Sequence, residues 1–329
     1  MGSLSAERYL VTGAYGCIGA WVVRELLSQG AYVASFDLAA DSPRLPLIVD
    51  EQHLEQLVRA QGDITDLGAV ERAIDENEIT RIIHLAALQV PFCRANPPAG
   101  AAVNVVGTAN IFEAVADRLD RIPHVVFASS IAAYDAYVDG EAPAMVGMPS
   151  TMYGIYKRAT EQMATMYAAE RGVPSIGLRP HTVYGPGRDQ GLTSSPTMAM
   201  LAAAGGIPFN IPYSGSAQFQ HAQDAARVFI QASMAPAKGA QIANLAGSTV
   251  SINEIIADIE EVRPGVRGTI TISGDPLAFP AEVPHGNLST VVGAEVFDRP
   301  LRDGVRDTIE HFERAIVDQR IDANALLAR

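Results

Sequence analysis

The stretch VTGAYGCIGAWVVRELL, from Val11 to Leu27, decides the fold of this 329-residue chain. It places Gly13, Gly16 and Gly19 at the spacing G-x-x-G-x-x-G, between a short apolar run and a helix with apolar periodicity. Glycines at a strand-to-helix turn let the backbone approach a pyrophosphate, and the helix N-terminus supplies free N–H groups and partial positive charge. The stretch therefore predicts the phosphate-binding turn of a dinucleotide-binding unit.

An acidic residue further along the chain makes this interpretation more specific. Asp37 ends the second apolar stretch, 18 residues after Gly19. A carboxylate there accepts hydrogen bonds from the adenosine ribose and repels a 2′-phosphate, which favours NAD over NADP. The alternative is an acidic residue that only caps a strand, because spaced glycines alone are weak evidence in a chain with 28 of them.

Strands and helices alternate through the first 180 residues. Strands are expected at 9–11, 31–37, 58–62, 81–87, 124–130 and 174–180. Helices are expected at 15–29, 67–77, 101–119 and 152–171. Strands separated by helices of this length indicate right-handed crossovers and an α/β fold with a doubly wound parallel sheet of the Rossmann type.

The second half of the chain predicts a smaller, mixed α/β substrate-binding lobe. Residues 1–180 and about 218–245 are assigned to the Rossmann domain, and residues 181–217 and 246–329 to the lobe. A helix at 224–234 is expected to return to the main sheet, with Asp224 as its N-cap. Ser251 and Glu254 fit a capping box for a helix at 252–261, and the last helix is expected at 305–316.

Composition excludes several functional classes. The formal net charge of −13 disfavours nucleic-acid binding. No apolar run is expected to span a bilayer, and the first residues do not resemble a signal peptide. The two cysteines, Cys17 and Cys93, lack metal-site spacing to histidines and fit a reducing compartment. The chain is therefore expected to be cytoplasmic, with a small-molecule substrate and without nucleic-acid, membrane or metal partners.

The segment YGIYKRATE carries a candidate acid/base pair. Tyr153 and Lys157 are four residues apart, so on a helix they share one face. A nearby ammonium stabilises phenolate and lowers a pKa that starts near about 10, so the tyrosine can exchange protons with an alcohol or carbonyl. The chain has only two lysines, so chance predicts roughly 0.06 such pairs. The alternative is a surface helix pair without a role.

The segment FASSIAAY carries candidate serines. Ser129 and Ser130 end the strand expected at 124–130, at the carboxyl edge where open α/β sheets bind ligands. A hydroxyl there is placed to orient a substrate oxygen toward Tyr153. Neither serine lies in a G-x-S-x-G elbow, which argues against a hydrolase.

These motifs together resemble the extended short-chain dehydrogenases/reductases, also called the NAD-dependent epimerase/dehydratase family. TGAYGCIG fits the family's T-G-x-x-G-x-x-G turn, and F-x-S-S-x-x-x-Y, anchored by Tyr134, matches Ser130 to the catalytic serine. Further similar segments are GDITD (62–66), HLAA (84–87), NVVGTANIFEA (104–114), LRPHTVYGPGR (178–188), HAQDAARVFI (221–230) and LRDGVRDTIEHF (301–312).

The resemblance implies a set of site residues. The catalytic residues are Ser130, Tyr153 and Lys157. NAD is expected to contact Gly13, Tyr15, Gly16, Cys17, Ile18, Gly19, Asp37, Asp63, Ile64, Leu85, Ala86, Ala87, Asn104, Tyr153, Lys157, Pro180 and Val183. The substrate is expected to contact Gln89, Ser130, Thr182, Arg188 and His221. Asn104 has the alternative role of satisfying buried backbone groups.

Two departures from the family pattern bear on the substrate. Nucleotide-sugar members usually carry asparagine at the position of Thr182 and a phosphate-binding arginine at the position of Ala217. We therefore expect a small polyhydroxylated substrate: a sugar, a sugar acid or a similar hydroxy or keto compound.

The expected activity is NAD-dependent hydride transfer in carbohydrate metabolism, with Tyr153 as acid/base, Lys157 lowering its pKa and Ser130 polarising the reacting oxygen. The alternative is a sugar or nucleotide-sugar epimerase or dehydratase with tightly bound NAD. A minor alternative is a dinucleotide-binding protein without catalysis. By analogy with the family, the chain is expected to form a homodimer through helices 101–119 and 152–171.

Overall fold

A seven-stranded, wholly parallel sheet forms the body of the molecule in the computed structural model, which describes residues 4–136, 144–277, 279–297 and 299–328. The strand order is β10-β6-β5-β4-β1-β2-β3, so the direction of winding reverses between β1 and β4. The strands are β1 Arg8–Thr12, β2 Tyr32–Asp37, β3 Val58–Gln61, β4 Arg81–His84, β5 Val125–Ala128, β6 Ser175–Arg179 and β10 Ala240–Asn244. The predicted α/β Rossmann-type fold is confirmed, with β10 as a strand that the sequence analysis did not identify.

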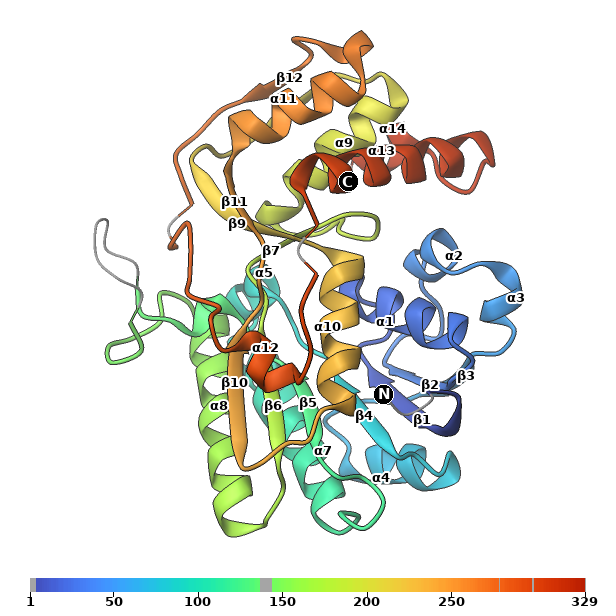
Figure 1. The fold of residues 1–329 in the computed structure, drawn as a ribbon, viewed down its shortest axis with the longest axis vertical. Coiled ribbons are helices and arrows are strands. Elements are labelled where there is room, and N and C mark those ends of the chain that lie inside the picture. Colours follow the sequence, from blue (N-terminus) through green and yellow to red (C-terminus); the bar gives the residue numbers. More distant parts are fainter. Residues whose placement is uncertain (1–3, 137–143, 278, 298, 329) are drawn as a thin grey trace.

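Helices cover both faces of this sheet (Figure 1). Successive residues of the central strand face opposite ways: Tyr9 and Val11 belong to one core cluster and Leu10 to the other. The first cluster lies under α1 (Cys17–Ser28) and α10 (Ala222–Met234). The second lies under α4 (Leu67–Glu76), α7 (Gly107–Ala116) and α8 (Met152–Glu170).

Several short helices lie around the main sheet. The sequence did not predict them. They are α2 (Arg44–Ile48), α3 (Glu51–Leu54), α5 (Val90–Ala95), α6 (Pro97–Ala101), α12 (Leu288–Val292) and the 3₁₀ turns at Leu4–Ala6 and Ile131–Ala133. The helix expected at 101–119 is divided: α6 passes through a π-helical turn, Ala102–Val106, into α7. Asn104 lies in this turn, where its side chain hydrogen-bonds the backbone of Leu88.

One helical run bears on the expectation about membrane spans. Pro97–Ala116 is long and apolar enough to cross a bilayer by length and composition alone. In this structure 44% of its apolar window is buried inside the protein. Ile111, Phe112 and Val115 of this run pack in the core cluster beneath the sheet.

Apart from α10, β10 and α12, which belong to the main body, the elements that follow β6 gather at one end of the molecule (Figure 1). They form two small sheets, one of β7 (Thr182–Tyr184), β9 (Ser216–His221) and β11 (Ser248–Ser251), the other of β8 (Phe209–Ile211) and β12 (Ile270–Ile272). Their helices are α9 (Ser195–Gly205), α11 (Ile252–Val262), α13 (Leu301–Val317) and α14 (Ala323–Leu327), with 3₁₀ turns at Leu192–Ser194 and Pro264–Val266. The predicted capping box of Ser251 and Glu254 begins α11.

Candidate active site

A cavity of about 1360 Å³ runs along the carboxyl ends of the parallel strands. It includes the point where the strand order reverses, between β1 and β4. Ligand pockets usually measure about 300–1,000 Å³, so this cavity has room for a dinucleotide and a second molecule. Its position is the one at which open α/β sheets bind ligands.

The glycine turn after β1 forms one wall of this cavity. Gly13 has φ +64, and a Cβ there would lie 2.6 Å from the backbone nitrogen of Ala86. A Cβ on Gly19 would lie 2.2 Å from the carbonyl oxygen of Gly13. Gly16 begins α1 without a side-chain cap, so the first N–H groups of the helix are available to an anion. The turn therefore fits a pyrophosphate.

The predicted cofactor residues, with one exception, line this cavity. Asp37, at the end of β2, also accepts a hydrogen bond from the backbone N–H of Tyr15, at 3.1 Å, which fixes it beside the turn. Asn104 is the exception, because it is buried (1% exposed) and its amide bonds the N–H and C=O of Leu88 at 2.7 and 2.9 Å. It shapes the loop after β4 rather than facing the cavity.

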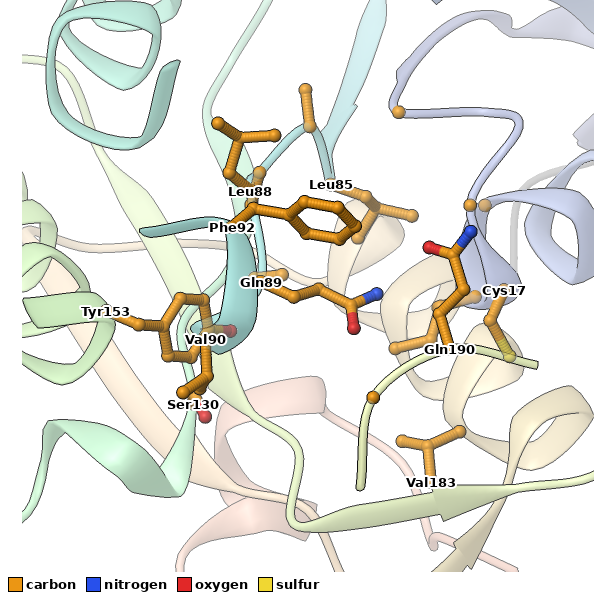
Figure 2. Close-up of a pocket in the computed structure, with 18 of the residues that line it drawn as sticks. Cys17, Leu85, Leu88, Gln89, Val90, Phe92, Ser130, Tyr153, Val183 and Gln190 are labelled. Carbon is orange, nitrogen blue, oxygen red and sulfur yellow. The ribbon is translucent and has the colours of Figure 1, made fainter. Parts of the chain in front are cut away.

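The three predicted catalytic residues come together at the same cavity. Thr151 caps α8 and so sets Tyr153 in its first turn, next to the end of β5. The hydroxyls of Tyr153 and Ser130 are hydrogen-bonded, and Figure 2 shows both side chains on one side of the cavity, across from Cys17 of the glycine turn. Lys157 Nζ lies 5.7 Å from the Tyr153 ring centroid and donates to the Ala128 carbonyl at 2.6 Å.

The pKa of Tyr153 is raised rather than lowered in this structure, contrary to the expectation from sequence. Burial raises it to about 12, opposed by the Ser130 hydrogen bond and the charge of Arg188. Burial also lowers the pKa of Lys157 to about 8, opposed by Cys93 and Glu161. The ammonium is directed to a backbone carbonyl, so the phenolate depends on further positive charge at the site.

The substrate end of the cavity is basic. Arg188 donates to the Gln89 side chain at 3.4 Å and to Thr193 at 2.7 Å, while its Nε is buried without a hydrogen-bond partner among the described residues. The cavity-lining carboxylates in the described ranges lie at or after the ends of β2 and β3: Asp37, Asp41 and Asp63. A substrate near Tyr153 therefore meets cations and amides rather than acids.

His221 does not line the cavity and corrects a predicted substrate contact. It is 4% exposed, packs edge-on against Tyr184 at 5.3 Å, and accepts a hydrogen bond from the Gln223 N–H to cap α10. The helix therefore begins at Ala222, and Asp224, the predicted cap, lies within it and pairs with Arg299.

The structure adds cavity residues that the sequence did not reveal. Val90 and Phe92 of α5 and Gln190 line the mouth, and Figure 2 shows Gln89 between the catalytic end and Gln190. Arg44 is the first residue of α2. Its guanidinium donates to both oxygens of Asp189 and to the Tyr15 carbonyl, at 2.6–3.2 Å. This contact, which we call the Arg44–Asp189 strap, joins residues 145 positions apart, so no local pattern predicts it.

Comparison with known proteins gives consistent matches. The model of the family described as "NAD dependent epimerase/dehydratase family" matches residues 9–246. A probable UDP-glucuronate 4-epimerase of Rhizobium meliloti is 32% identical over 248 residues, 70% of this chain and 69% of that protein. A UDP-glucuronate 4-epimerase of Thermodesulfobacterium geofontis is 30% identical over 273 residues, 77% and 80% of the two chains. UDP-glucuronate 4-epimerase 6 of Arabidopsis thaliana is matched over only 40% of its own length.

Solved structures share the fold. The Thermus thermophilus UDP-glucose 4-epimerase in complex with NAD has a TM-score of 0.76 at 24% identity, covering 94% of this chain and 99% of that one. The GalE-like L-threonine dehydrogenase of Cupriavidus necator has a TM-score of 0.77 at 22% identity, covering 92% and 99%. Both epimerases and dehydrogenases are thus built on this architecture.

Proposed function

The chain belongs to the NAD-dependent epimerase/dehydratase family and is an enzyme whose cofactor is NAD, and from this premise we propose that it is a carbohydrate epimerase that retains its NAD. The sequence motifs led us to expect net oxidation first, with epimerisation as the alternative. Relatives that are at least 30% identical and named UDP-glucuronate 4-epimerases favour the second. The proposal reverses that order.

The observation that carries the proposal is the meeting of the Ser130–Tyr153 hydroxyl pair with the glycine turn and Asp37 in one cavity. NAD, when bound, would supply a hydride acceptor and donor. Tyr153 would take the proton from the substrate hydroxyl as the carbon that bears it is oxidised. It would return that proton when the same carbon is reduced at its opposite face, while Ser130 orients the oxygen.

The Arg44–Asp189 strap supports retention of the cofactor. It crosses from α2 to the loop after β7 and is anchored on the backbone of Tyr15 in the glycine turn. An epimerase must return the hydride to the same molecule, so it gains from holding NAD between the two half-reactions. A dehydrogenase must exchange the cofactor in every cycle.

We further propose a carboxylated carbohydrate as substrate. Arg188 offers a planar guanidinium with an unpartnered Nε, and guanidinium groups bind carboxylates in two-point geometry. Glucuronate, in the names of the relatives, carries such a group.

A second candidate is a dehydrogenase of free sugar acids. The arginine expected for a nucleotide diphosphate is replaced by Ala217, which is buried (1% exposed). Among the described residues that follow Arg188 in the sequence, none with a basic side chain lines the cavity, whereas Arg44, Arg94 and Lys157 before it do. Both features favour a substrate without a nucleotide.

One experiment separates these activities. The purified protein is denatured to release and quantify NAD, and the native protein is incubated with UDP-glucuronate, free glucuronate and a panel of aldonates. We expect bound NAD and conversion of a uronate to its C4 epimer by NMR, without accumulation of NADH. Stoichiometric NADH with any substrate would establish the dehydrogenase instead. The absence of both bound NAD and turnover would refute both candidate functions.

A further inference from the structure

Glu161 is a buried carboxylate that the proposed reaction does not use. Tyr153, Lys157 and Glu161 follow one another at four-residue intervals along α8 and therefore lie on one face. The Glu161 side chain is 7% exposed. It accepts two hydrogen bonds from Arg179, each of 2.6 Å, and one from the hydroxyl of Ser129.

The contact with Ser129 ties Glu161 to the catalytic strand end. Three consecutive residues at the end of β5 each meet a different side chain of α8. The Ala128 carbonyl accepts from Lys157, the Ser129 hydroxyl donates to Glu161, and the Ser130 hydroxyl bonds Tyr153. A shift of the Ser129 contact would therefore move the partners of both catalytic groups.

Arg179 links Glu161 to a second set of contacts, which leads toward the lining of the cavity. Its guanidinium lies 4.9 Å from the ring centroid of Tyr134. The Tyr134 hydroxyl accepts from Asn244 at 2.8 Å, and Asn244 also donates to the Pro284 carbonyl at 2.6 Å. The segment that leads to Pro284 includes Phe279, which lines the cavity.

A buried ion pair of this kind adds little net stability. Removing two charges from water costs several kcal/mol, and apolar replacements of such pairs are often as stable or more so. What a fully hydrogen-bonded pair does provide is a fixed geometry and a fixed charge. Because Glu161 lies one helical turn from Lys157, both the fixed geometry and the fixed charge of the pair act next to Lys157.

We propose that Glu161 and Arg179 are positioning residues of the catalytic site: Glu161 fixes the Ser129–Ser130 strand end and keeps Lys157 charged, and Arg179 holds Glu161 in place. This inference rests on the catalytic set of the proposed function. Neither residue is proposed to touch the substrate or NAD.

The groups that face Lys157 determine how its charge responds. From α8 these are Tyr153 and Glu161, from α5 Cys93, and from β4 His84, whose pKa burial lowers to about 3, so that it is neutral. Among the described residues whose charge acts on Lys157, Glu161 is the one with a carboxylate. Its negative charge raises the pKa of Lys157 against burial, so its neutralisation moves Lys157 to deprotonate at lower pH.

The chain offers a direct test, because Lys157 and Lys238 are its only lysines. The protein is prepared with isotopically labelled lysine, and its two side-chain NMR signals are titrated in wild type and in Glu161→Gln. We expect the Lys157 signal to titrate at lower pH in the variant, while the signal of the exposed Lys238 does not change. This readout needs no substrate, so it remains valid if the proposed function fails.

Activity gives the second readout. With any substrate that turns over, Glu161→Gln is expected to lower kcat about 10- to 100-fold with little change in KM, and to move the alkaline limb of the kcat profile to lower pH. The matched control is Glu113→Gln, which breaks an exposed ion pair of Arg171 at the far end of α8 and should leave kcat and its pH profile unchanged.

A double variant, Glu161→Gln with Arg179→Gln, covers the case in which an unpaired Arg179 prevents folding. It removes both charges and should fold, with lowered kcat and the shifted Lys157 titration. Wild-type kcat and an unmoved Lys157 signal in a folded, NAD-loaded variant would overturn the proposal and leave the pair a purely structural feature.

Discussion

Burial sets the chemistry of single residues in this cavity more than their sequence neighbours do. Tyr153 and Lys157 lie as the Tyr-x-x-x-Lys spacing predicts, but desolvation acts on both and disfavours the charged form of each. The hydroxyl of Ser130 and the charge of Arg188 oppose the effect on Tyr153. Burial therefore favours the protonated form of the tyrosine in this structure.

Replacement of Tyr153 tests its role as acid/base. Tyr153→Phe removes the proton-transfer group and is expected to lower kcat about 100- to 10,000-fold, without loss of bound NAD. The control is Tyr156→Phe, whose hydroxyl bonds the Pro97 carbonyl outside the cavity and which should keep near-normal kcat. Steady-state kinetics and the NAD content of each preparation are compared. Normal turnover by Tyr153→Phe would exclude the assigned role.

Asp37 is expected to set the preference for NAD. Asp37→Asn removes the charge that repels a 2′-phosphate and weakens the ribose contact, so NAD binding should lose about 1.5–3 kcal/mol while the preference moves toward NADP. Titration calorimetry with both dinucleotides measures this. Asp41→Asn, at the same end of the cavity, is the control. An unchanged ratio of the two affinities would mean that Asp37 only caps β2.

At the scale of elements, the structure forms the long helix α8 as predicted, but it divides another predicted helix and adds short helices that were not predicted. The expected helix at 152–171 is α8, whereas the one at 101–119 is divided by a π-helical turn that brings Asn104 to the loop after β4. The short helices α2 and α5 have no apolar periodicity long enough to predict. They nevertheless bring Arg44 and Phe92 to the cavity.

The Arg44–Asp189 strap belongs to this scale because it joins α2 to the loop after β7. Asp189→Asn should speed NAD dissociation about fivefold, equivalent to about 1 kcal/mol for a partly exposed pair. Stopped-flow exchange of bound NAD for a fluorescent analogue gives the rate. Asp303→Asn, which loses an exposed pair with Arg306, serves as the control. Equal dissociation rates in both variants would remove the strap as an argument for retention.

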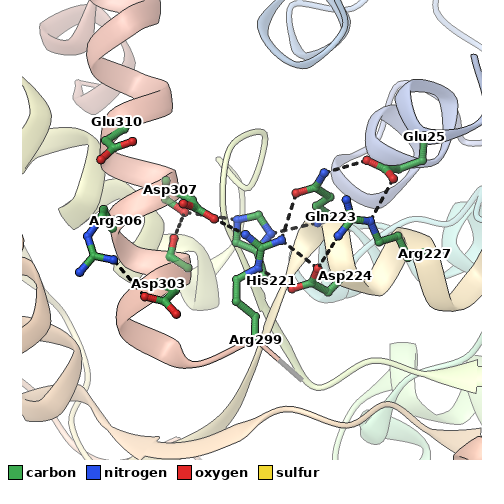
Figure 3. Close-up of polar contacts among 12 residues, drawn as sticks. Glu25, His221, Gln223, Asp224, Arg227, Arg299, Asp303, Arg306, Asp307 and Glu310 are labelled. Carbon is green, nitrogen blue, oxygen red and sulfur yellow. Dashed lines mark hydrogen bonds and ion pairs between the residues drawn. The ribbon is translucent and has the colours of Figure 1, made fainter. Parts of the chain in front are cut away.

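At the scale of the whole molecule, a charged network joins α1, α10 and α13 (Figure 3). Arg299, before α13, pairs with Asp224 of α10 and with Asp307 of α13, and Arg227 of α10 pairs with Glu25 of α1. The Arg299 and Asp224 side chains are each 12% exposed. The network therefore holds α13 against α10 and α1.

Loss of Arg299 should destabilise the fold rather than the chemistry. Arg299→Leu leaves Asp224 without its main partner and is expected to cost about 3–5 kcal/mol of unfolding free energy. Arg306→Ala, in an exposed pair, should cost less than about 0.5 kcal/mol. Urea denaturation measures both. A cost for Arg299→Leu as small as that for Arg306→Ala would show that the network is not structural.

Acid is expected to destabilise the protein through its buried histidines. His84 is 3% exposed between Thr12 and Thr108, and burial lowers its pKa from 6.5 to about 3. The unfolded state therefore binds more protons between these two values, so stability is complete above pH 6.5 and falls as the pH drops toward 3. Denaturation between about pH 5 and about pH 7 should show a smaller slope in His84→Gln. An equal slope would contradict this account.

The sequence by itself determined the parallel sheet, the glycine turn and the position of Tyr153 and Lys157 on one helix face, because local period, turn chemistry and spacing along one helix are short-range properties. The roles of Ser130, Tyr153 and Lys157 and the NAD contacts stay predictions. It left the homodimer a prediction. Only the tertiary structure decided that His221 and Asn104 lie outside the cavity, that Arg44 meets Asp189, and that Glu161 lies between Ser129 and Arg179. Those contacts join residues distant in sequence, and burial of side chains follows from packing of the whole chain rather than from any local pattern.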